Sequence, residues 1–331
     1  KEALACQENQ KLNRKLKMYF GLSEDQIFFQ DNVKKFLEDN APLDAVKKIT
    51  EGADLSTKDE LHQGLINLGI NNILIPEENG GLGLDLLFAS AVSQSLGEGI
   101  ATLPFVGPYV IAPIAIKYGA SDSQKEKLFN EMSQNLINCG VGFSEYFGSR
   151  DSSDLSISNN KITGRTLFVL DIDFASHVML CDKKGQIGLV SLESKGIEII
   201  DLTTVDKTRT YKEMIFKDTP IEILDKTKTS IEAAEMALSA GRIVTAADSL
   251  GASQAMINKA VEYSKERKQF NRVIGSFQAV KHMCAEMTAE LEPCYSLVWH
   301  AAHSFDDSHE DSKLMACLAK SHTSEVSKMV S

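Results

Sequence analysis

The chain has 331 residues, of which 43% are apolar and 24% charged, and its formal net charge is -11 with a pI near 5.2. This length exceeds what one hydrophobic core usually supports, and the composition is that of a globular protein. Nucleic acid is not an expected partner, because phosphate affinity comes from clustered Lys and Arg, whereas the basic run at residues 11–17 is short and terminal.

The cysteine pattern favours free, buried thiols in a reducing compartment such as the bacterial cytoplasm. No C-x-x-C pair and no His at ligand spacing accompanies the six residues, which are Cys6, Cys139, Cys181, Cys284, Cys294 and Cys317. No apolar run approaches the ~18 residues that a membrane span requires. Residues 1–17 precede Met18, a candidate native start, and we assign them no function.

The first 138 residues are predicted to form a helical domain. Ser23 and Gln26 form a capping box for a helix that ends before Pro42, and a second helix runs from about residue 58 to 69. Further helices are expected at 86–96, 108–118 and 123–132. Between them lies a Pro- and Gly-rich turn at 73–84, which the residues alone explain as an interhelical connection.

Residues 139–225 are predicted to form a β-domain. Five short β-rich runs separated by turn residues indicate a small antiparallel sheet or barrel. The runs are 161–170, 177–181, 187–191, 196–200 and 211–216.

Residues 226–331 are predicted to form a helical bundle. One long helix runs to about Lys268, and a third helix begins near Asp311. The helix between them carries an apolar seam with spacings of three and four, interrupted by Pro293, and such a seam needs partner helices. Its members are Phe277, Val280, Cys284, Met287, Leu291, Cys294, Val298, Ala301 and Phe305. The predicted fold class is therefore α+β and multidomain.

Simple catalytic motifs are not visible. The chain has no G-x-G-x-x-G after a strand, no Walker loop and no G-x-S-x-G elbow. His300 and His303 share a helical face without the partner pattern of a metal site, so no metal is expected.

The stretch at residues 266–282 has two interpretations. Arg267 and Lys268 lie at the end of a helix, where positive charges interact favourably with the helix dipole, and this is a sufficient structural reason for both. The same stretch, with Phe270, Phe277 and Gln278, also suits a nucleotide, and the residues alone leave both interpretations open.

Four segments together resemble the acyl-CoA dehydrogenases. Residues 267–278 look like the R-x-x-F-G-x-x-I-x-x-x-Q region of that family, and residues 75–83 are similar to its P-E-x-x-G-G-x-G loop. Residues 118–125 are similar to its G-x-x-x-Q-K turn, and residues 205–209 look like the close of its β-domain. The resemblance runs from about Ser23 to the end of the chain.

The resemblance implies an oligomeric flavoprotein of fatty acid metabolism that uses FAD. Arg267 would contact the pyrophosphate of an FAD bound by a neighbouring subunit, with Phe270, Phe277 and Gln278 near the adenine. The flavin ring would lie against residues 143–145 (Phe143, Ser144 and Glu145) and against the strand that carries Phe168, and Arg242 would lie near the thioester. The implied partners are an acyl-CoA substrate, electron-transfer flavoprotein as acceptor, and further subunits of a homo- or hetero-oligomer.

Several positions depart from the family pattern. The W-I-T segment, which places a hydroxyl beside the flavin, corresponds to residues 168–170 (Phe-Val-Leu). The T-E-P and G-S-D pattern is replaced by Tyr146 and a displaced segment at 148–151. One family position for the catalytic Glu is Gly241 here, and the other follows a Q-x-x-G-G segment that does not occur before Ser331. Asp248 is two turns further along the helix and is interpreted as structural.

These observations support one leading hypothesis and two alternatives. The leading hypothesis is FAD-dependent α,β-dehydrogenation of an acyl-CoA thioester, with the base located beyond Ser331 in an incomplete chain. The first alternative is a non-catalytic partner subunit of a hetero-oligomeric acyl-CoA dehydrogenase. The second is a related flavin oxidase or monooxygenase.

Overall fold

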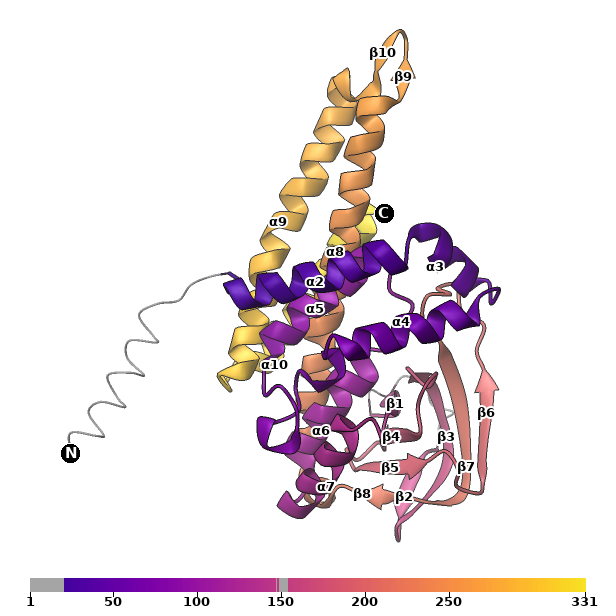
Figure 1. The fold of residues 1–331 in the computed structure, drawn as a ribbon. Helices are drawn as coiled ribbons and strands as arrows, with labels where there is room; N and C mark the ends of the chain where they lie inside the picture. Colours follow the sequence, from indigo (N-terminus) through magenta and orange to yellow (C-terminus); the bar gives the residue numbers. More distant parts are fainter. Residues whose placement is uncertain (1–20, 147, 149–153) are drawn as a thin grey trace, which may run out of the picture.

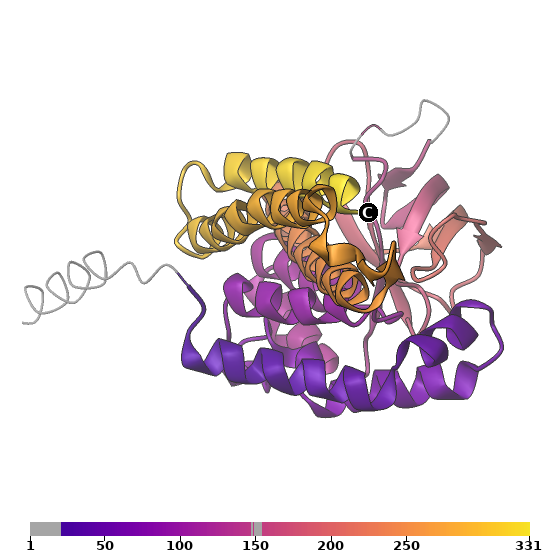
Figure 2. The same cartoon turned by 90° about the horizontal axis from the view of Figure 1, so that it is seen from above.

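The computed structural model describes residues 21–146, 148 and 154–331. A block of helices is followed by a β-sheet and then by a second block of helices (Figure 1). Residues 1–17, and most of the displaced segment at 148–151, lie outside the described residues. Figure 2 shows α5 and α6 in the middle of the molecule, between the first helices of the chain and the last ones.

The N-terminal block contains more helices than the sequence predicts. The helices are α2 (Glu24–Asn40), α3 (Leu43–Thr50), α4 (Leu55–Asn67), α5 (Leu86–Glu98), α6 (Ala112–Gly119) and α7 (Asp122–Ser133), with the short η1 (Ile70–Asn72), η2 (Glu77–Asn79) and π-helical η3 (Gly107–Ile111). The predicted capping box begins α2: the Gln26 amide donates to the Ser23 hydroxyl at 3.2 Å, and the Ser23 amide donates to the Gln26 side chain at 2.8 Å.

The helix α3 was not predicted, because its eight residues are too few for a clear periodic pattern.

The Pro- and Gly-rich turn at residues 73–84 brings two stretches of backbone into contact. A Cβ on Gly81 would lie 2.0 Å from the carbonyl oxygen of Ile75, so only glycine fits there.

The middle of the chain forms one eight-stranded sheet in the order β6-β7-β3-β1-β4-β5-β8, with β2 paired to β3. The strands are β1 (Cys139–Gly142), β2 (Ser156–Ser158), β3 (Lys161–Leu170), β4 (His177–Cys181), β5 (Ile187–Ser191), β6 (Ile197–Asp201), β7 (Tyr211–Pro220) and β8 (Glu222–Ile223). The five predicted runs correspond to β3 to β7. The sheet is mixed and not wholly antiparallel, because β1 pairs with β4 in parallel.

The last block is built on one long helix. It contains η4 (Asp225–Lys228), α8 (Glu232–Glu266), the hairpin strands β9 (Lys268–Gln269) and β10 (Arg272–Val273), η5 (Ile274–Ser276), α9 (Gln278–Asp306) and α10 (Ser312–Val330). The helix α9 continues through Pro293. Its seam is buried from Leu291 onward, whereas Phe277, Val280 and Cys284 stay only partly covered.

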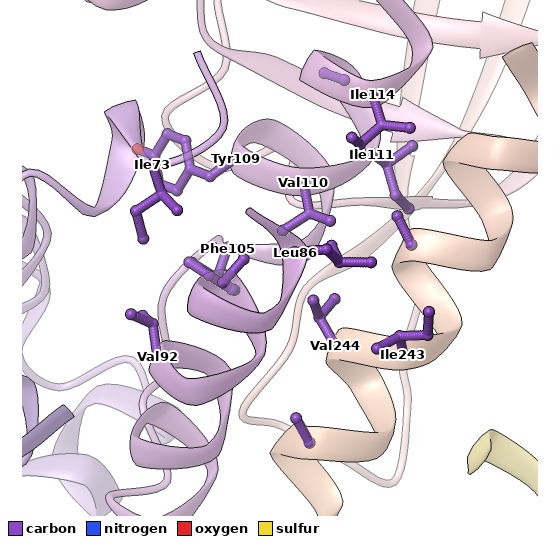
Figure 3. Close-up of a cluster of buried hydrophobic side chains, with 14 of the residues drawn as sticks. Ile73, Leu86, Val92, Phe105, Tyr109, Val110, Ile111, Ile114, Ile243 and Val244 are labelled. Atoms are coloured by element: carbon purple, nitrogen blue, oxygen red, sulfur yellow. The ribbon is translucent and has the colours of Figure 1, made fainter. Parts of the chain in front are cut away.

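The helices α5 and α8 cross with their backbones in contact. A Cβ on Gly251 would lie 1.9 Å from the carbonyl oxygen of Gln94, and one on Gly97 would lie 2.0 Å from that of Asp248. At the same crossing, the Ser93 hydroxyl donates to the Val244 carbonyl at 2.7 Å. One hydrophobic core therefore extends from the N-terminal helices across α8, and Figure 3 shows side chains of α5, η3, α6 and α8 meeting in it.

Cys139, Cys181 and Cys294 are buried free thiols, as predicted, but Cys317 is exposed. In the described part of the chain, no helix is long and apolar enough to cross a membrane. The same residues contain no group of three or more side chains that could hold a metal ion.

Candidate functional site

The end of β1 is tied to β3 by a buried hydroxyl. Phe143, Ser144 and Glu145 are all buried. The Ser144 hydroxyl donates to the Leu167 carbonyl at 2.6 Å and lies 3.3 Å from the Thr166 hydroxyl. These contacts hold the turn after β1 beside the residues that precede Phe168.

A β-bulge turns Phe168 away from the sheet. The pairing of β3 with β7 shifts register between Thr166 and Val169, and Phe168 adopts a positive φ of 53°. Its side chain is 41% exposed and makes an edge-to-face contact with Tyr211, with ring centroids 6.4 Å apart. An exposed aromatic ring therefore follows Leu167, whose carbonyl accepts the hydrogen bond from Ser144.

Glu145 is a buried carboxylate without a hydrogen-bond donor. The residue is 1% exposed, and neither carboxylate oxygen has a hydrogen-bond partner. A buried charge in this state costs several kcal/mol, so groups of this kind are usually paired. Each oxygen exposes less than 1 Å², so protein atoms cover the carboxylate.

Arg242 lies near the same turn. Its side chain is half-buried on α8. Burial raises the pKa of Tyr146 and the charge of Glu235 adds to the rise, while the positive charges of Lys313 and Arg242 oppose it. The charge of Arg242 thus acts directly beside the end of β1.

The helix position that could carry a catalytic carboxylate is a glycine that packs against Ile111. Gly241 is buried, and a Cβ there would lie 3.0 Å from Cδ1 of Ile111. Asp248 pairs with Arg209 at 2.8 Å, and Arg209 also donates to the Ala101 carbonyl. The interpretation of Asp248 as structural agrees with this ion pair, which joins α8 to the loop before β7.

The predicted nucleotide-binding residues lie at the tip of the α8–α9 pair. Phe270 and Asn271 both have positive φ (52° and 61°) and form the two-residue turn between β9 and β10. Phe270 is 87% exposed and meets Phe277 edge to face at 6.1 Å, and the Arg272 guanidinium lies 3.9 Å from the Phe277 ring centre.

Arg267 and Gln278 flank this hairpin and are exposed. Gly275 allows it to approach α8, because a Cβ there would lie 2.9 Å from the Ser264 carbonyl oxygen. A groove of about 530 Å³ runs beside the hairpin and is lined by Val261, Ser264, Lys265, Val273, Gly275, Ser276, Val280, Lys281 and Cys284.

The predicted site residues fall into two groups within one chain. The structure brings Phe143, Ser144, Glu145 and Phe168 together at the end of β1, and the charge of Arg242 acts on the adjoining Tyr146. It places the hairpin group (Arg267, Phe270, Phe277 and Gln278) at the far end of α8 and α9, away from the sheet (Figure 1). One chain therefore cannot surround a single ligand with both groups.

Sequence reasoning missed the second hydroxyl at this site. Thr166 is fully buried beside Ser144. Gly142, just before the turn, packs closely against Leu180, since a Cβ on it would lie 2.8 Å from the Leu180 side chain. The signal that could have identified Thr166 was a polar side chain on the buried face of the β-rich run at 161–170. The bulge that follows obscured it, since Thr166 and Leu167 are both buried and break the alternation.

Two family models match the chain. The acyl-CoA dehydrogenase N-terminal domain matches residues 23–135 and the acyl-CoA dehydrogenase C-terminal domain matches residues 231–331. A 3-(aryl)acrylate reductase of Clostridium sporogenes is 26% identical, over 85% of this chain and 81% of the relative. The caffeyl-CoA reductase-Etf complex subunit CarC of Acetobacterium woodii is 24% identical, over 93% of this chain and 86% of the relative.

Solved structures share the fold. The ChsE4-ChsE5 complex from Mycobacterium tuberculosis superposes with a TM-score of 0.82 at 19% identity, covering 95% of this chain and 86% of that chain. This likeness shows the fold. The two family models, at residues 23–135 and 231–331, show that the chain belongs to the acyl-CoA dehydrogenase family of oxidoreductases, whose members bind FAD.

The residues at the end of β1 fit a flavin. The Ser144 hydroxyl oxygen can accept a hydrogen bond as well as donate one, and the hydroxyl and N–H groups of a flavin nucleotide are donors. The exposed Phe168 ring offers an apolar surface beside them. Leu170 supplies no hydroxyl at the position where the family has one, so that single contact is missing.

Proposed function

We propose that the protein binds FAD between two subunits and takes part in the α,β-dehydrogenation of an acyl-CoA thioester. The observation that carries the proposal is the separation of the two residue groups. The hairpin group projects from the body of its own chain, which suits contact with a flavin held at the β1 turn of a neighbouring subunit (Figure 1).

The chain's own residues would act in two places. Arg267 on the exposed hairpin provides a planar cation for a pyrophosphate, with Phe270 and Gln278 beside it for a base. At the other place, the turn at residues 143–145 would lie against the ring end, and Arg242 would contribute positive charge near a thioester. Bound FAD supplies the hydride acceptor for this chemistry.

Removal of the α-proton requires a carboxylate as general base. Such a base typically raises the rate by about a hundredfold to ten-thousandfold. Among the described residues, Gly241 carries none and Asp248 is committed to Arg209. These two observations favour a second candidate function, a non-catalytic subunit that contributes its hairpin to a flavin held by a catalytic paralogue.

Purified protein separates the two candidates. A yellow protein whose flavin absorbance falls on addition of a saturated acyl-CoA supports the dehydrogenase. Because two relatives are named reductases, the dithionite-reduced protein should also be tested with enoyl-CoA thioesters. Colourless protein that acquires FAD only with a second polypeptide would support the partner subunit and overturn autonomous catalysis.

A further inference from the structure

A groove of about 470 Å³ lies between α7 and the sheet edge formed by β5 and β8. It is found where β1 and β4 begin, because His177 lines it and pairs with Cys139 in the parallel ladder. The turn at residues 143–145 follows the other end of β1, and α7 and β8 lie at the end of the molecule opposite the hairpin (Figure 1). The groove is therefore separate from both groups of the proposed flavin site.

The floor of the groove is apolar. Its buried side chains come from α7, the loop after it, β5 and the connection between β7 and β8, and they are Leu128, Ile137, Leu189 and Ile221. Leu136 also lines the groove and is 63% exposed. An apolar surface thus continues from the floor to an exposed leucine, as at protein interaction sites.

The backbone after α7 holds Leu136 in this exposed place. Asn135 has a positive φ of 57° and turns the chain away from the helix. The Leu136 amide then donates to the Glu131 carbonyl at 2.8 Å, a bond that closes the end of the helix. The exposure of Leu136 is therefore a consequence of how α7 ends.

The charges around the groove are mainly negative. Three carboxylates and one ammonium act on the His177 imidazole, namely Glu131, Glu193, Glu222 and Lys127. Lys127 pairs with Glu222 at 3.0 Å, whereas Glu131 and Glu193 have no ion-pair partner among the described residues. Burial lowers the pKa of His177, although the three carboxylates oppose this, so the imidazole is neutral near pH 7 and leaves the negative charge uncompensated.

An apolar floor beside unpaired carboxylates matches a cationic segment with an apolar side chain. In protein interfaces, an anchor side chain in a pocket provides much of the affinity, and opposite charges around it favour the correct partner. A small molecule usually buries roughly 70–90% of its surface, which the exposed Leu136 does not suit. A second copy is a poor match, because each copy has a net charge of -11 and its basic hairpin is assigned to the flavin.

We propose that the groove between α7 and β5 is a docking site for another polypeptide, which inserts an apolar side chain flanked by Lys or Arg. The apolar side chain packs on the floor and against Leu136, and the flanking cations meet Glu131 and Glu193. This proposal goes beyond the proposed function and does not depend on it, because the groove shares no residue with the flavin site.

The test uses the full-length protein and three blocked peptides that carry the same dye, with binding measured by fluorescence anisotropy at low salt. The probe is Gly-Ser-Arg-Leu-Arg-Ser-Gly. One comparison peptide has Glu in place of both Arg, and the other has Ser in place of Leu. We expect the probe to bind with a Kd of about 1 mM or lower, and each comparison peptide to bind about tenfold more weakly or worse.

Variants of the protein locate the binding. Glu131→Lys and Leu136→Ser should each weaken binding of the probe by about tenfold. Glu126→Lys is the matched control, because it makes the same charge change at an exposed position of α7 that does not line the groove. It should change the affinity by less than about twofold. Melting temperatures check that each variant is folded.

Three results would overturn the proposal. The first is equal affinity of the wild type for all three peptides, or no binding of the probe at a few mM. The second is equal affinity of the probe for Glu131→Lys, Leu136→Ser and Glu126→Lys. The third is a change of oligomeric size in gel filtration for Glu131→Lys but not for Glu126→Lys, since a second copy would then occupy the groove.

Discussion

Gly241 on α8 and Ile111 at the end of η3 face each other so closely that a Cβ on the glycine would lie 3.0 Å from the isoleucine Cδ1. Both residues are buried in the core shown in Figure 3. An apolar side chain from another helix therefore packs against this family position for the catalytic carboxylate. The helix α8 supplies no base next to Arg242, because residue 241 is a glycine and has no side chain.

Gly241→Glu should destabilise the protein without creating activity. A side chain there overpacks the core at a cost of about 1–3 kcal/mol, and a buried carboxylate adds to it. Urea unfolding would measure the loss, with Gly241→Ala as the smaller-volume control. Combining Gly241→Glu with Ile111→Ala should recover part of the stability. Equal stability of Gly241→Glu and the wild type would show that this position is open.

Gly251→Ala should be one of the more damaging methyl additions in the chain. The added Cβ would lie 1.9 Å from the Gln94 carbonyl oxygen, so α5 and α8 must separate. We expect a loss of about 3 kcal/mol or more. Lys259→Ala, at an exposed position of the same helix, is the control and should change stability by less than about 0.5 kcal/mol. Similar melting temperatures for the two variants would contradict the close crossing.

Asp171 should make the folded state less stable as the pH rises. Burial raises its pKa from the usual 3.8 to about 6, although the Gly107 amide and the Arg209 charge oppose the rise. Below pH 4 the carboxyl is protonated in both the folded and unfolded states. Between pH 4 and 6 the unfolded chain releases its proton first, so stability falls by roughly 3 kcal/mol and stays lower above pH 6.

The variant Asp171→Asn should lack this pH dependence, because the amide does not ionise in this range. Its stability relative to the wild type should improve between pH 4 and pH 7. Urea unfolding at intervals of half a pH unit measures the difference. A difference that stays constant with pH would show that Asp171 does not titrate in this window.

The Arg209–Asp248 ion pair should contribute to stability and not to cofactor binding. Its atoms lie 2.8 Å apart, and both side chains are about three-quarters covered. Asp248→Ala should cost about 1–3 kcal/mol, because it leaves Arg209 without its acid. A double-mutant cycle with Arg209→Ala should give a coupling energy of about 1 kcal/mol. Loss of FAD from Asp248→Ala at unchanged stability would instead point to a functional carboxylate.

Local signals in the sequence predicted most of the fold. The Ser23 and Gln26 capping box, the five runs from β3 to β7 and the seam of α9 each depend on nearby residues. The short elements were missed because they contain too few residues to form a clear local pattern. The helix α3 is only eight residues long, so its apolar pattern does not clearly indicate a helix. The strand β1 contains two glycines in its four residues, and glycine has a low preference for strands.

The site was less predictable, because its chemistry depends on contacts between distant segments. Arg267 and Phe270 could be located by their motif. The exposed Phe168 depends on a bulge against β7, and the unpartnered state of Glu145 depends on every element packed around it. The closure of Gly241 by Ile111 likewise depends on how η3 meets α8.

The variant Arg267→Ala tests whether the α8–α9 hairpin binds the FAD of a neighbouring subunit. The measurement is the number of FAD molecules per chain after gel filtration, with circular dichroism to confirm the helices. Lys268→Ala removes the same charge from the next exposed residue and serves as the control. We predict that Arg267→Ala weakens FAD binding by about tenfold or more and elutes largely without flavin, while Lys268→Ala keeps it. Equal flavin content in the two variants and the wild type would contradict the account.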